Sequence, residues 1–338
     1  MVRWKNLKVV QEEKIYNLIV CLTPLQALIA CKIIDIFPNE KFFVLFINLK
    51  SNETYEYYNQ KLSAKSLKTW VIKRKQYPKI GDLLTFIKFK MTLERSILSY
   101  QYNKVLFASI DDPIIQYIIK HGEYKEINTF DDGFANLSIE SAYFKESRTI
   151  KYNLKKLFFN NSFNLILLKN RITRHYTIFE NNPFLSPDKT FKLNMFLISS
   201  SVSESNVIIK RIFVGQPMKS ISPHLTEDYL NDVLKTLKID YYFPHPQEQD
   251  NYDFENVQII NSDLIFEDYV LDFLKKEPTL KILVYGLFST ILITMSQAGI
   301  ECYYITDTLL NKKYANIHKV LNDNNVCRIE INKNIVEE

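Results

Sequence analysis

Glycine is scarce in this chain, with six glycines among 338 residues. Three of the six close apolar, strand-like runs: Gly133, Gly215 and Gly286. In open α/β folds, ligands bind at the carboxyl ends of strands, where glycine lets the backbone approach a ligand closely. The placement of these three glycines therefore predicts a ligand cleft built from several strand ends.

Other features are missing as well. The four cysteines form no C-x-x-C pair and no zinc-site spacing. Cys21, Cys31 and Cys302 lie in apolar surroundings, which predicts buried thiols in a reducing compartment. Residues 1–14 lack the apolar core of a signal peptide, and no run approaches the ~20 apolar residues of a membrane span. We expect a cytoplasmic protein, at most peripheral to the inner membrane face.

The charge of the chain is modest, with a formal net charge of +5. No basic stripe interleaved with aromatic residues is present, so we expect no nucleic-acid partner. The charge suits transient contact with an anionic membrane face or an acidic glycan. The length allows two domains of ordinary size.

Apolar runs alternate with helical patterns in both halves of the chain, which predicts βαβ units and parallel sheets. Thr23 and Pro24 are predicted to open a helix that ends near Phe37. The expected strands lie at 17–22, 42–47, 105–108, 126–130, 207–214, 239–243, 257–260, 282–285 and 301–305. Further helices are expected at 227–237, 264–275 and 290–297.

A serine-rich stretch at 199–205 is the best linker candidate. It predicts a Rossmann-like domain at 1–198 and a second one at 206–338, with a ligand crevice between them. The pattern within 151–192 assigns no element with clarity.

Asp131, Asp132 and Gly133 follow the strand expected at 126–130. Two adjacent carboxylates at a strand end can supply a general base, its pKa raised by the neighbouring charge. An Asp-Gly turn with helix capping explains the same residues, and a metal-binding pair is a third interpretation. Adjacent aspartates point apart on a strand, and no other metal ligand lies nearby in sequence, which disfavours metal.

His245 lies between Pro244 and Pro246 at the end of the strand expected at 239–243. The prolines restrict the backbone and fix where the imidazole points. Histidine is suited to exchange a proton near neutral pH. The alternative is a histidine whose hydrogen bonds are satisfied within a turn.

Two further candidates belong to the second half. Ser289 and Thr290 follow Gly286 and open a helix, where backbone N–H groups and hydroxyls can bind a phosphate, although simple capping is the alternative. Glu267 lies in the first turn of another helix, which acidic residues favour anyway. A carboxylate there can also bind ribose hydroxyls.

With these residues in place, the chain resembles the bacterial lipooligosaccharide-type sialyltransferases of glycosyltransferase family 52. The resemblance covers most of the chain. It is carried by the segments 17–26, 129–133 with Asn136 and Leu137, 175–179, 244–246, 267–269 and 288–289.

The resemblance implies a GT-B architecture, two Rossmann-like domains that face a central cleft. It implies inverting transfer from CMP-sialic acid to a terminal sugar, often galactose, of a lipooligosaccharide or capsular glycan, without metal or cofactor. By this similarity His245 protonates the departing CMP phosphate, Ser289 and Thr290 bind that phosphate, Glu267 binds ribose and Gly215 approaches cytosine. Other expected substrate contacts are Thr23, Gln26, Gly133, Pro244, Pro246 and Gly286. Relatives form homodimers, so a dimer is plausible.

The chain departs from the family at the base. A well-studied type in the family has an aspartate after a Gly-x-Pro turn, whereas here Met218 follows Gly215-Gln216-Pro217. Related sialyltransferases use the first aspartate of an Asp-Asp-Gly turn, so we expect Asp131 as base, with Asp132 second. The departure keeps two alternatives open: a GT-B transferase that uses another nucleotide sugar, and a non-catalytic glycan- or nucleotide-binding protein.

Overall fold

The computed structural model of the chain describes residues 15–48, 50, 52–73, 90–141, 143–144, 165–195, 207–245, 248, 252–277 and 279–331. The linker expected at 199–205 lies outside these residues, and so does Pro246.

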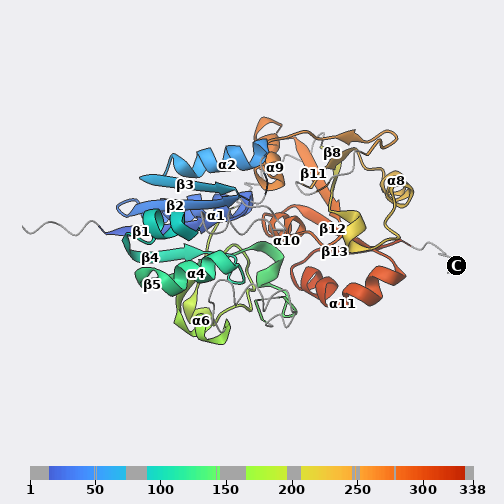
Figure 1. The fold of residues 1–338 in the computed structure, drawn as a ribbon. Helices are drawn as coiled ribbons and strands as arrows, with labels where there is room; N and C mark the ends of the chain where they lie inside the picture. The colour runs from blue at the N-terminus through green and yellow to red at the C-terminus, as the bar shows by residue number, and fades with distance from the viewer. Residues whose placement is uncertain are drawn as a thin grey trace, which may run out of the picture.

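A seven-stranded parallel sheet forms the N-terminal half (Figure 1). Its strand order is β3-β2-β1-β4-β5-β6-β7. Ile19 of the central strand pairs with Val44 on one side and Leu106 on the other. The strands are β1 (Tyr16–Cys21), β2 (Lys41–Asn48), β3 (Lys68–Lys73), β4 (Gln101–Phe107), β5 (Glu123–Phe130), β6 (Ile172–Thr177) and β7 (Thr190–Lys192).

A six-stranded parallel sheet forms the C-terminal half, in the order β10-β9-β8-β11-β12-β13. Its strands are β8 (Ile208–Val214), β9 (Tyr241–Phe243), β10 (Gln258–Ile259), β11 (Leu280–Gly286), β12 (Glu301–Thr306) and β13 (Cys327–Glu330). The long strands are near-continuous apolar runs because parallel sheets are covered on both faces.

Helices cover the sheets. Those of the first half are α1 (Pro24–Ile36), α2 (Glu53–Ser63), α4 (Pro113–His121) and α6 (Leu165–Arg171), with short turns η2 (Leu93–Ile97), η3 (Gly133–Asn136) and η4 (Pro187–Lys189). Those of the second half are α7 (Met218–Ile221), α8 (Glu227–Thr236), α9 (Phe266–Lys276), α10 (Thr290–Gln297) and α11 (Thr308–Asp323). None of the helices in the described ranges is long and apolar enough to cross a bilayer.

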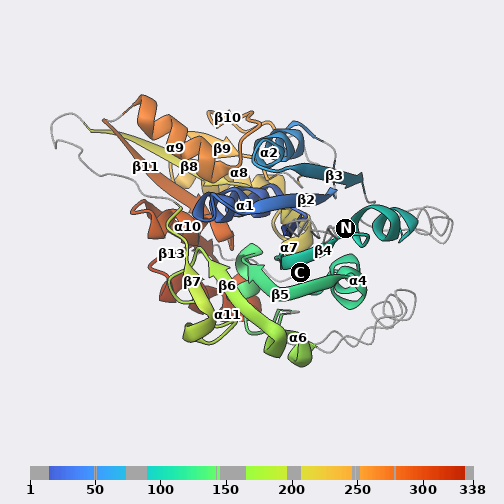
Figure 2. The same ribbon diagram turned by 90° about the vertical axis from the view of Figure 1, so that its left-hand side faces the viewer.

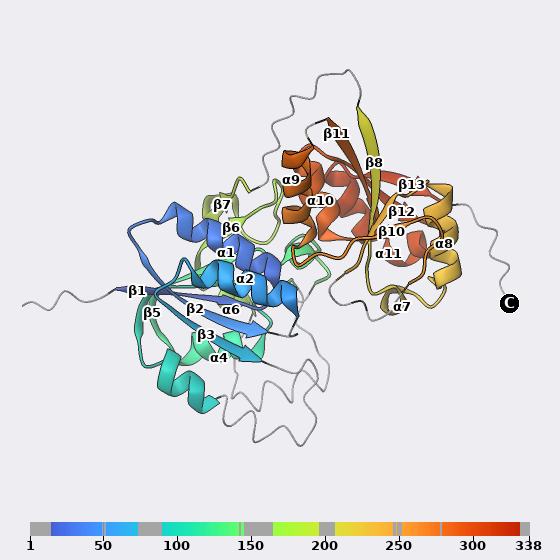
Figure 3. The ribbon, with the colours of Figure 1, turned by 90° about the horizontal axis from the view of Figure 1, so that it is seen from above.

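One hydrophobic core is shared by the two halves. It contains Ile29 and Ile33 of α1 together with Leu292 and Met295 of α10 and Val270 of α9, all essentially inaccessible to solvent. Figure 3 shows α9 and α10 on the side of the C-terminal domain that faces the N-terminal one. The edge-on view of Figure 2 places α1 between the N-terminal sheet and this contact. The relative position of the domains is therefore fixed by apolar packing.

The predicted pair of Rossmann-like α/β domains, each with a parallel sheet, is confirmed. Every strand and helix expected from the sequence is present, with bounds shifted by a few residues. The sequence did not predict four strands: β3, β6, β7 and β13. Two of them, β3 and β13, lie at the edges of their sheets. Their residues are partly or fully exposed, so neither strand has the long apolar run that marks a buried strand. Cys21, Cys31 and Cys302 are free and buried, as predicted.

Candidate functional site

The Asp-Asp-Gly turn of the N-terminal domain touches the first turn of α10 in the C-terminal domain. The Phe134 backbone N–H donates to Thr290 Oγ1 at 2.9 Å. Gly133 has a φ of +84°, and a Cβ atom placed on it would lie 2.9 Å from the same Thr290 oxygen. Glycine is therefore required here both by backbone conformation and by contact between the domains.

Asp132 is held by three side-chain donors from the N-terminal domain. Ser109 Oγ donates to Asp132 Oδ2 at 2.9 Å, Tyr143 donates to the same oxygen at 2.5 Å, and Gln26 Nε2 donates to Oδ1. Asp132 as a residue is half-buried, while its three partners are buried. Burial raises the pKa of Asp132, and the hydrogen bonds oppose that rise. The result is a fixed carboxylate beside the junction of the domains.

Asp131 points the other way and is completely buried. Its carboxylate accepts from the Ile178 N–H at 2.6 Å, Thr177 Oγ1 at 2.8 Å and Asn182 Nδ2 at 2.8 Å, and lies 3.0 Å from His175 Nε2. These contacts fasten the segment after β6 to the end of β5. A carboxylate enclosed in this way is not presented to a substrate, although the sequence ranks it first as base.

His245 follows Pro244 at the end of β9, and its backbone N–H donates to Glu248 Oε2 at 2.7 Å. Burial lowers the pKa of the imidazole to about 4, and the positive charge of Lys50 contributes to the decrease. Lys50 follows β2, so a side chain of the N-terminal domain lies within electrostatic reach of this histidine. His245 therefore lies near the N-terminal domain, and its lowered pKa makes the imidazole neutral at pH 7 in the free protein.

The glycines at the ends of β8 and β11 fit against neighbours. A Cβ atom on Gly215 would approach Glu248 Oε2 and the Tyr242 hydroxyl to 2.5 Å. A Cβ atom on Gly286 would approach Val214 Cγ2 to 2.7 Å. Both positions exclude larger residues because the local packing is close.

The start of α10 has the capping geometry expected from sequence. Ser289 is the N-cap and accepts from the Ile291 N–H at 3.2 Å, and Thr290 receives the Phe134 N–H. The helix opens beside Phe288, whose N–H donates to Gln216 Oε1 at 3.0 Å. Both hydroxyls thus have protein partners, and the helix N-terminus lies beside the Asp-Asp-Gly turn.

Glu267 lies in the first turn of α9 and is 3% exposed. Its Oε1 accepts from Thr294 Oγ1 at 3.2 Å, one turn along α10 from Thr290. Burial raises the pKa of Glu267 to about 7. The carboxyl group is therefore poised between protonated and ionised forms at neutral pH.

Thr23 and Gln26 lie at the start of α1, in the part of the N-terminal domain that holds Asp132. Thr23 caps α1 by accepting from the Gln26 N–H at 3.3 Å. Gln26 is completely buried, accepts from the Leu22 N–H at 2.7 Å and donates to Ser109 Oγ at 3.0 Å. Gln26 orients Asp132 and has little freedom left to bind a substrate directly.

Sequence reasoning missed Ser109, Tyr143, Lys50 and Glu248. Ser109 follows a predicted strand directly, so its position at a strand end was a usable signal. Tyr143 and Glu248 reach the site from loops, for which the sequence has no periodic signal. In the described ranges, no three His, Cys, Asp or Glu side chains group as a metal site.

The junction combines a fixed carboxylate, a histidine at a strand end, a helix N-terminus and a carboxyl group near its pKa. An acid, a base and an anion-binding helix start are the groups needed for transfer from a phosphate-activated donor. Fixed positions on two domains would orient donor and acceptor toward each other.

Known proteins match the chain over most of its length. The model of Glycosyltransferase family 52 matches residues 39–312. An N-acetyllactosaminide alpha-2,3-sialyltransferase of Haemophilus influenzae is 31% identical over 87% of this chain and 93% of its own length. A CMP-N-acetylneuraminate:beta-galactoside alpha-2,3-sialyltransferase of Pasteurella multocida is 28% identical over 82% of this chain and 87% of its own length.

A third relative, an N-acetyllactosaminide alpha-2,3-sialyltransferase of Neisseria meningitidis, is 27% identical over 90% of this chain and 82% of its own length. Among solved structures, Acinetobacter baumannii MurG aligns with a TM-score of 0.47 and 12% identity, covering 94% of this chain and 86% of that one.

Proposed function

The chain belongs to glycosyltransferase family 52, and from this premise we propose that it transfers sialic acid from CMP-sialic acid to a terminal galactose. The named activities of three relatives that span most of the chain support this donor, this acceptor sugar and an α-2,3 linkage. The transfer proposed is inverting and independent of metal. The acceptor proposed is a bacterial surface glycan, lipooligosaccharide or capsule.

The observation that carries the mechanism is the carboxylate of Asp132, which three donors hold in place in a half-buried residue of the turn that contacts the start of α10 through Phe134. In our proposal, Asp132 takes the proton of the acceptor hydroxyl, whose oxygen attacks the anomeric carbon of sialic acid. The bond from that carbon to the CMP phosphate breaks on the opposite face. A raised pKa makes Asp132 a stronger base than an ordinary aspartate.

His245 is proposed to balance the charge on the departing phosphate. Its pKa of about 4 in the free protein means that it is neutral before the donor binds. A bound phosphate favours the imidazolium electrostatically and raises this pKa. The donor thereby recruits the proton that His245 gives to the leaving CMP.

The two domains are proposed to divide the substrates. The C-terminal domain binds CMP, with its phosphate at the start of α10, ribose near Glu267 and cytosine near Gly215. The N-terminal domain receives the acceptor at Asp132. The position of Gly215 at the end of β8 supports the cytosine assignment, since a strand end is where a backbone can approach a ligand.

We expect His245→Ala to lower kcat by about 10²–10⁴-fold while changing the Kd for CMP by much less. Wild-type protein should take up a proton on binding CMP at pH 6, and the variant should take up less. Calorimetry in two buffers of different ionisation enthalpy measures this uptake. Loss of CMP affinity with intact kcat would contradict the acid role.

Turnover of the donor tests the function itself. Purified protein, CMP-sialic acid and EDTA are incubated with and without lactose, and CMP release is followed. Release that requires lactose and survives EDTA is the expected result. Absence of both release and CMP binding would refute the donor assignment.

A second candidate is transfer from another nucleotide sugar. It is favoured by Met218, which is 2% exposed and stands where a well-studied type in the family has an aspartate. Competition among CMP, UDP, GDP and ADP separates the two, because a CMP-sugar enzyme should prefer CMP clearly.

A further inference from the structure

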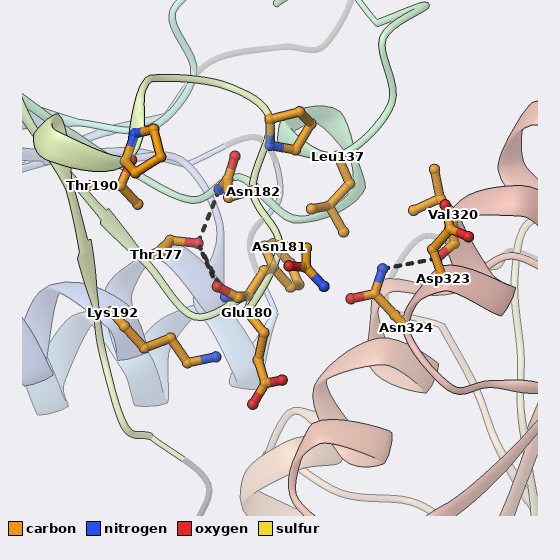
Figure 4. Close-up of a pocket in the computed structure, with 13 residues that line it drawn as sticks. Leu137, Thr177, Glu180, Asn181, Asn182, Thr190, Lys192, Val320, Asp323 and Asn324 are labelled. Atoms are coloured by element: carbon orange, nitrogen blue, oxygen red, sulfur yellow. Dashed lines mark hydrogen bonds between the residues drawn. The ribbon is translucent and has the colours of Figure 1, made fainter.

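A pocket of about 590 Å³ with a mixed polar and apolar lining opens at the seam between the two domains (Figure 4). One wall comes from the segment that joins β6 to β7 and the other from the last turn of α11. Its polar side chains are Thr177, Glu180, Asn181, Asn182, Thr190, Lys192, Asp323 and Asn324. A volume within the range of about 300–1,000 Å³ suits a small ligand.

The polar groups of the pocket are of two kinds. Thr177 and Asn182 are engaged with Asp131 and shape the wall. Asn181 and Asp323 are exposed and make no side-chain hydrogen bond to any residue that the structure describes. An amide and a carboxylate together offer donors and acceptors to a ligand that carries both, as a hydroxyl group does.

The remaining lining favours a ligand with apolar faces and no charge. Leu137, Pro183, Pro187 and Val320 present apolar surface between the polar groups. Among the lining residues that the structure describes, Glu180 and Asp323 outnumber the cation Lys192, so these charges disfavour an anion. A hexose ring has hydroxyls at its edge, C–H groups on its faces and no charge.

We propose that this pocket binds one or two neutral hexose rings of a glycan, away from the point of sialyl transfer. The identity of that glycan as the acceptor rests on the proposed function. Binding of a neutral oligosaccharide to the pocket does not.

The pocket adjoins the transfer site through η3. Gly133 begins this 3₁₀ turn, and Leu137 follows its end in the pocket wall. At about 2 Å of rise per residue, four residues cover about 8 Å. Asp131, the neighbour of Asp132, binds Thr177 and Asn182 of the wall formed by the segment between β6 and β7. A glycan whose last sugar lies at Asp132 thus has its inner sugars within reach of the pocket.

Contacts made here act on the binding of the glycan and not on the reacting atoms. They should therefore change KM for long acceptors and leave kcat unaltered. The test acceptor is a linear neutral tetrasaccharide whose accepting end is a lactose unit. Its KM should be about 5- to 10-fold below that of lactose, as expected for one or two added hydrogen bonds.

The test compares the two acceptors on wild type, Asn181→Ala, Asp323→Ala and the control Asn322→Ala. Asn322 is exposed on the same helix but does not line the pocket. The first two variants should raise KM for the tetrasaccharide toward that of lactose, with lactose kinetics and kcat unchanged. The control should match wild type. Equal KM values for both acceptors in wild type would overturn the proposal.

Calorimetric titration of the tetrasaccharide, without donor, separates this proposal from the proposed function. Binding that weakens in Asn181→Ala and Asp323→Ala supports the pocket even if no sialic acid is transferred. A Kd that is the same in all four proteins overturns it even if transfer is fast. Tighter binding of the sialylated than of the neutral glycan would refute the neutral ligand class.

Discussion

Two adjacent aspartates have opposite surroundings in this protein. Consecutive side chains at a strand end point to opposite sides, so one carboxylate enters the core and the other meets the domain junction. Asp131 accepts three hydrogen bonds, lies beside His175 and is inaccessible, whereas Asp132 is partly exposed. Asp131 therefore has a structural role, and Asp132 is the candidate base.

This contrast predicts different failures for the two asparagine variants. Asp132→Asn should lower kcat by about 10²–10⁴-fold with CMP affinity intact, because only the base is lost. Asp131→Asn should lose at least about 3 kcal/mol of stability, because an amide group would face buried donors. Thermal unfolding and single-turnover kinetics measure the two effects. A stable but inactive Asp131→Asn would return the base role to Asp131.

Glu267 predicts a pH dependence. Its pKa of about 7 in the folded protein exceeds the ordinary value of 4.5, so the folded state holds a proton that the unfolded chain releases between these values. The stability linked to this proton is complete below pH 4.5 and is lost as pH rises through 7. Glu267→Gln should remove that loss, worth up to about 3 kcal/mol.

Melting temperatures of wild type and Glu267→Gln, taken from pH 5 to pH 8, check this. The melting temperature of the variant minus that of wild type should increase as the pH rises. A difference that is constant across the range would mean that Glu267 does not titrate there. If Glu267 binds ribose, the same substitution should also weaken the binding of CMP.

Among the contacts between elements, the one between η3 and the start of α10 leaves the least space for a side chain at Gly133. Two glycines have similar left-handed conformations, Gly133 at φ +84° and Gly299 at φ +89°. Only Gly133 faces a neighbour, since a Cβ atom on Gly299 would meet nothing within 4 Å. The two glycines therefore share a positive φ, but only Gly133 is in contact with a neighbouring side chain, so each is a control for the other.

We expect Gly299→Ala to cost about 1 kcal/mol from backbone conformation and to keep activity. Gly133→Ala should cost more and reduce turnover, because the added methyl displaces Thr290 and with it the helix start. Melting temperature and kcat of both variants are the measurements. Equal losses in the two would show that the contact with Thr290 is unimportant.

At the scale of the whole molecule, polar contacts supplement the shared apolar core. Asp268 of α9 accepts from Lys61 Nζ at 2.7 Å and from the Tyr58 hydroxyl at 2.8 Å, both on α2. The Ile265 N–H in turn donates to the Tyr58 oxygen at 3.2 Å. These bonds join the domains on the side away from the seam pocket.

Asp268→Asn should lower the melting temperature by roughly 2–5 °C, because it removes a partly buried ion pair between domains. Asp272→Asn on the same helix is the control. Its pair with Lys276 is exposed and local, so the change should be within about 1 °C. A similar small effect in both would assign the domain contact to apolar packing alone.

The sequence by itself determined the alternation of strands and helices, the parallel sheets and the positions of Gly133, Gly215, Gly286, His245 and Ser289 at strand ends. Those features depend on local patterns of apolar residues and on caps, which the sequence displays directly. The order of the motifs along the chain also indicates the family, independently of the geometry.

Only the tertiary structure decided which aspartate is enclosed and which is exposed. It also revealed the partners of Asp132, since Ser109 follows β4, Gln26 lies in the first turn of α1 and Tyr143 comes from a loop. The seam pocket likewise needs α11 and the segment after β6, more than a hundred residues apart. Such groupings arise from how domains pack, and packing between distant segments has no period in the sequence.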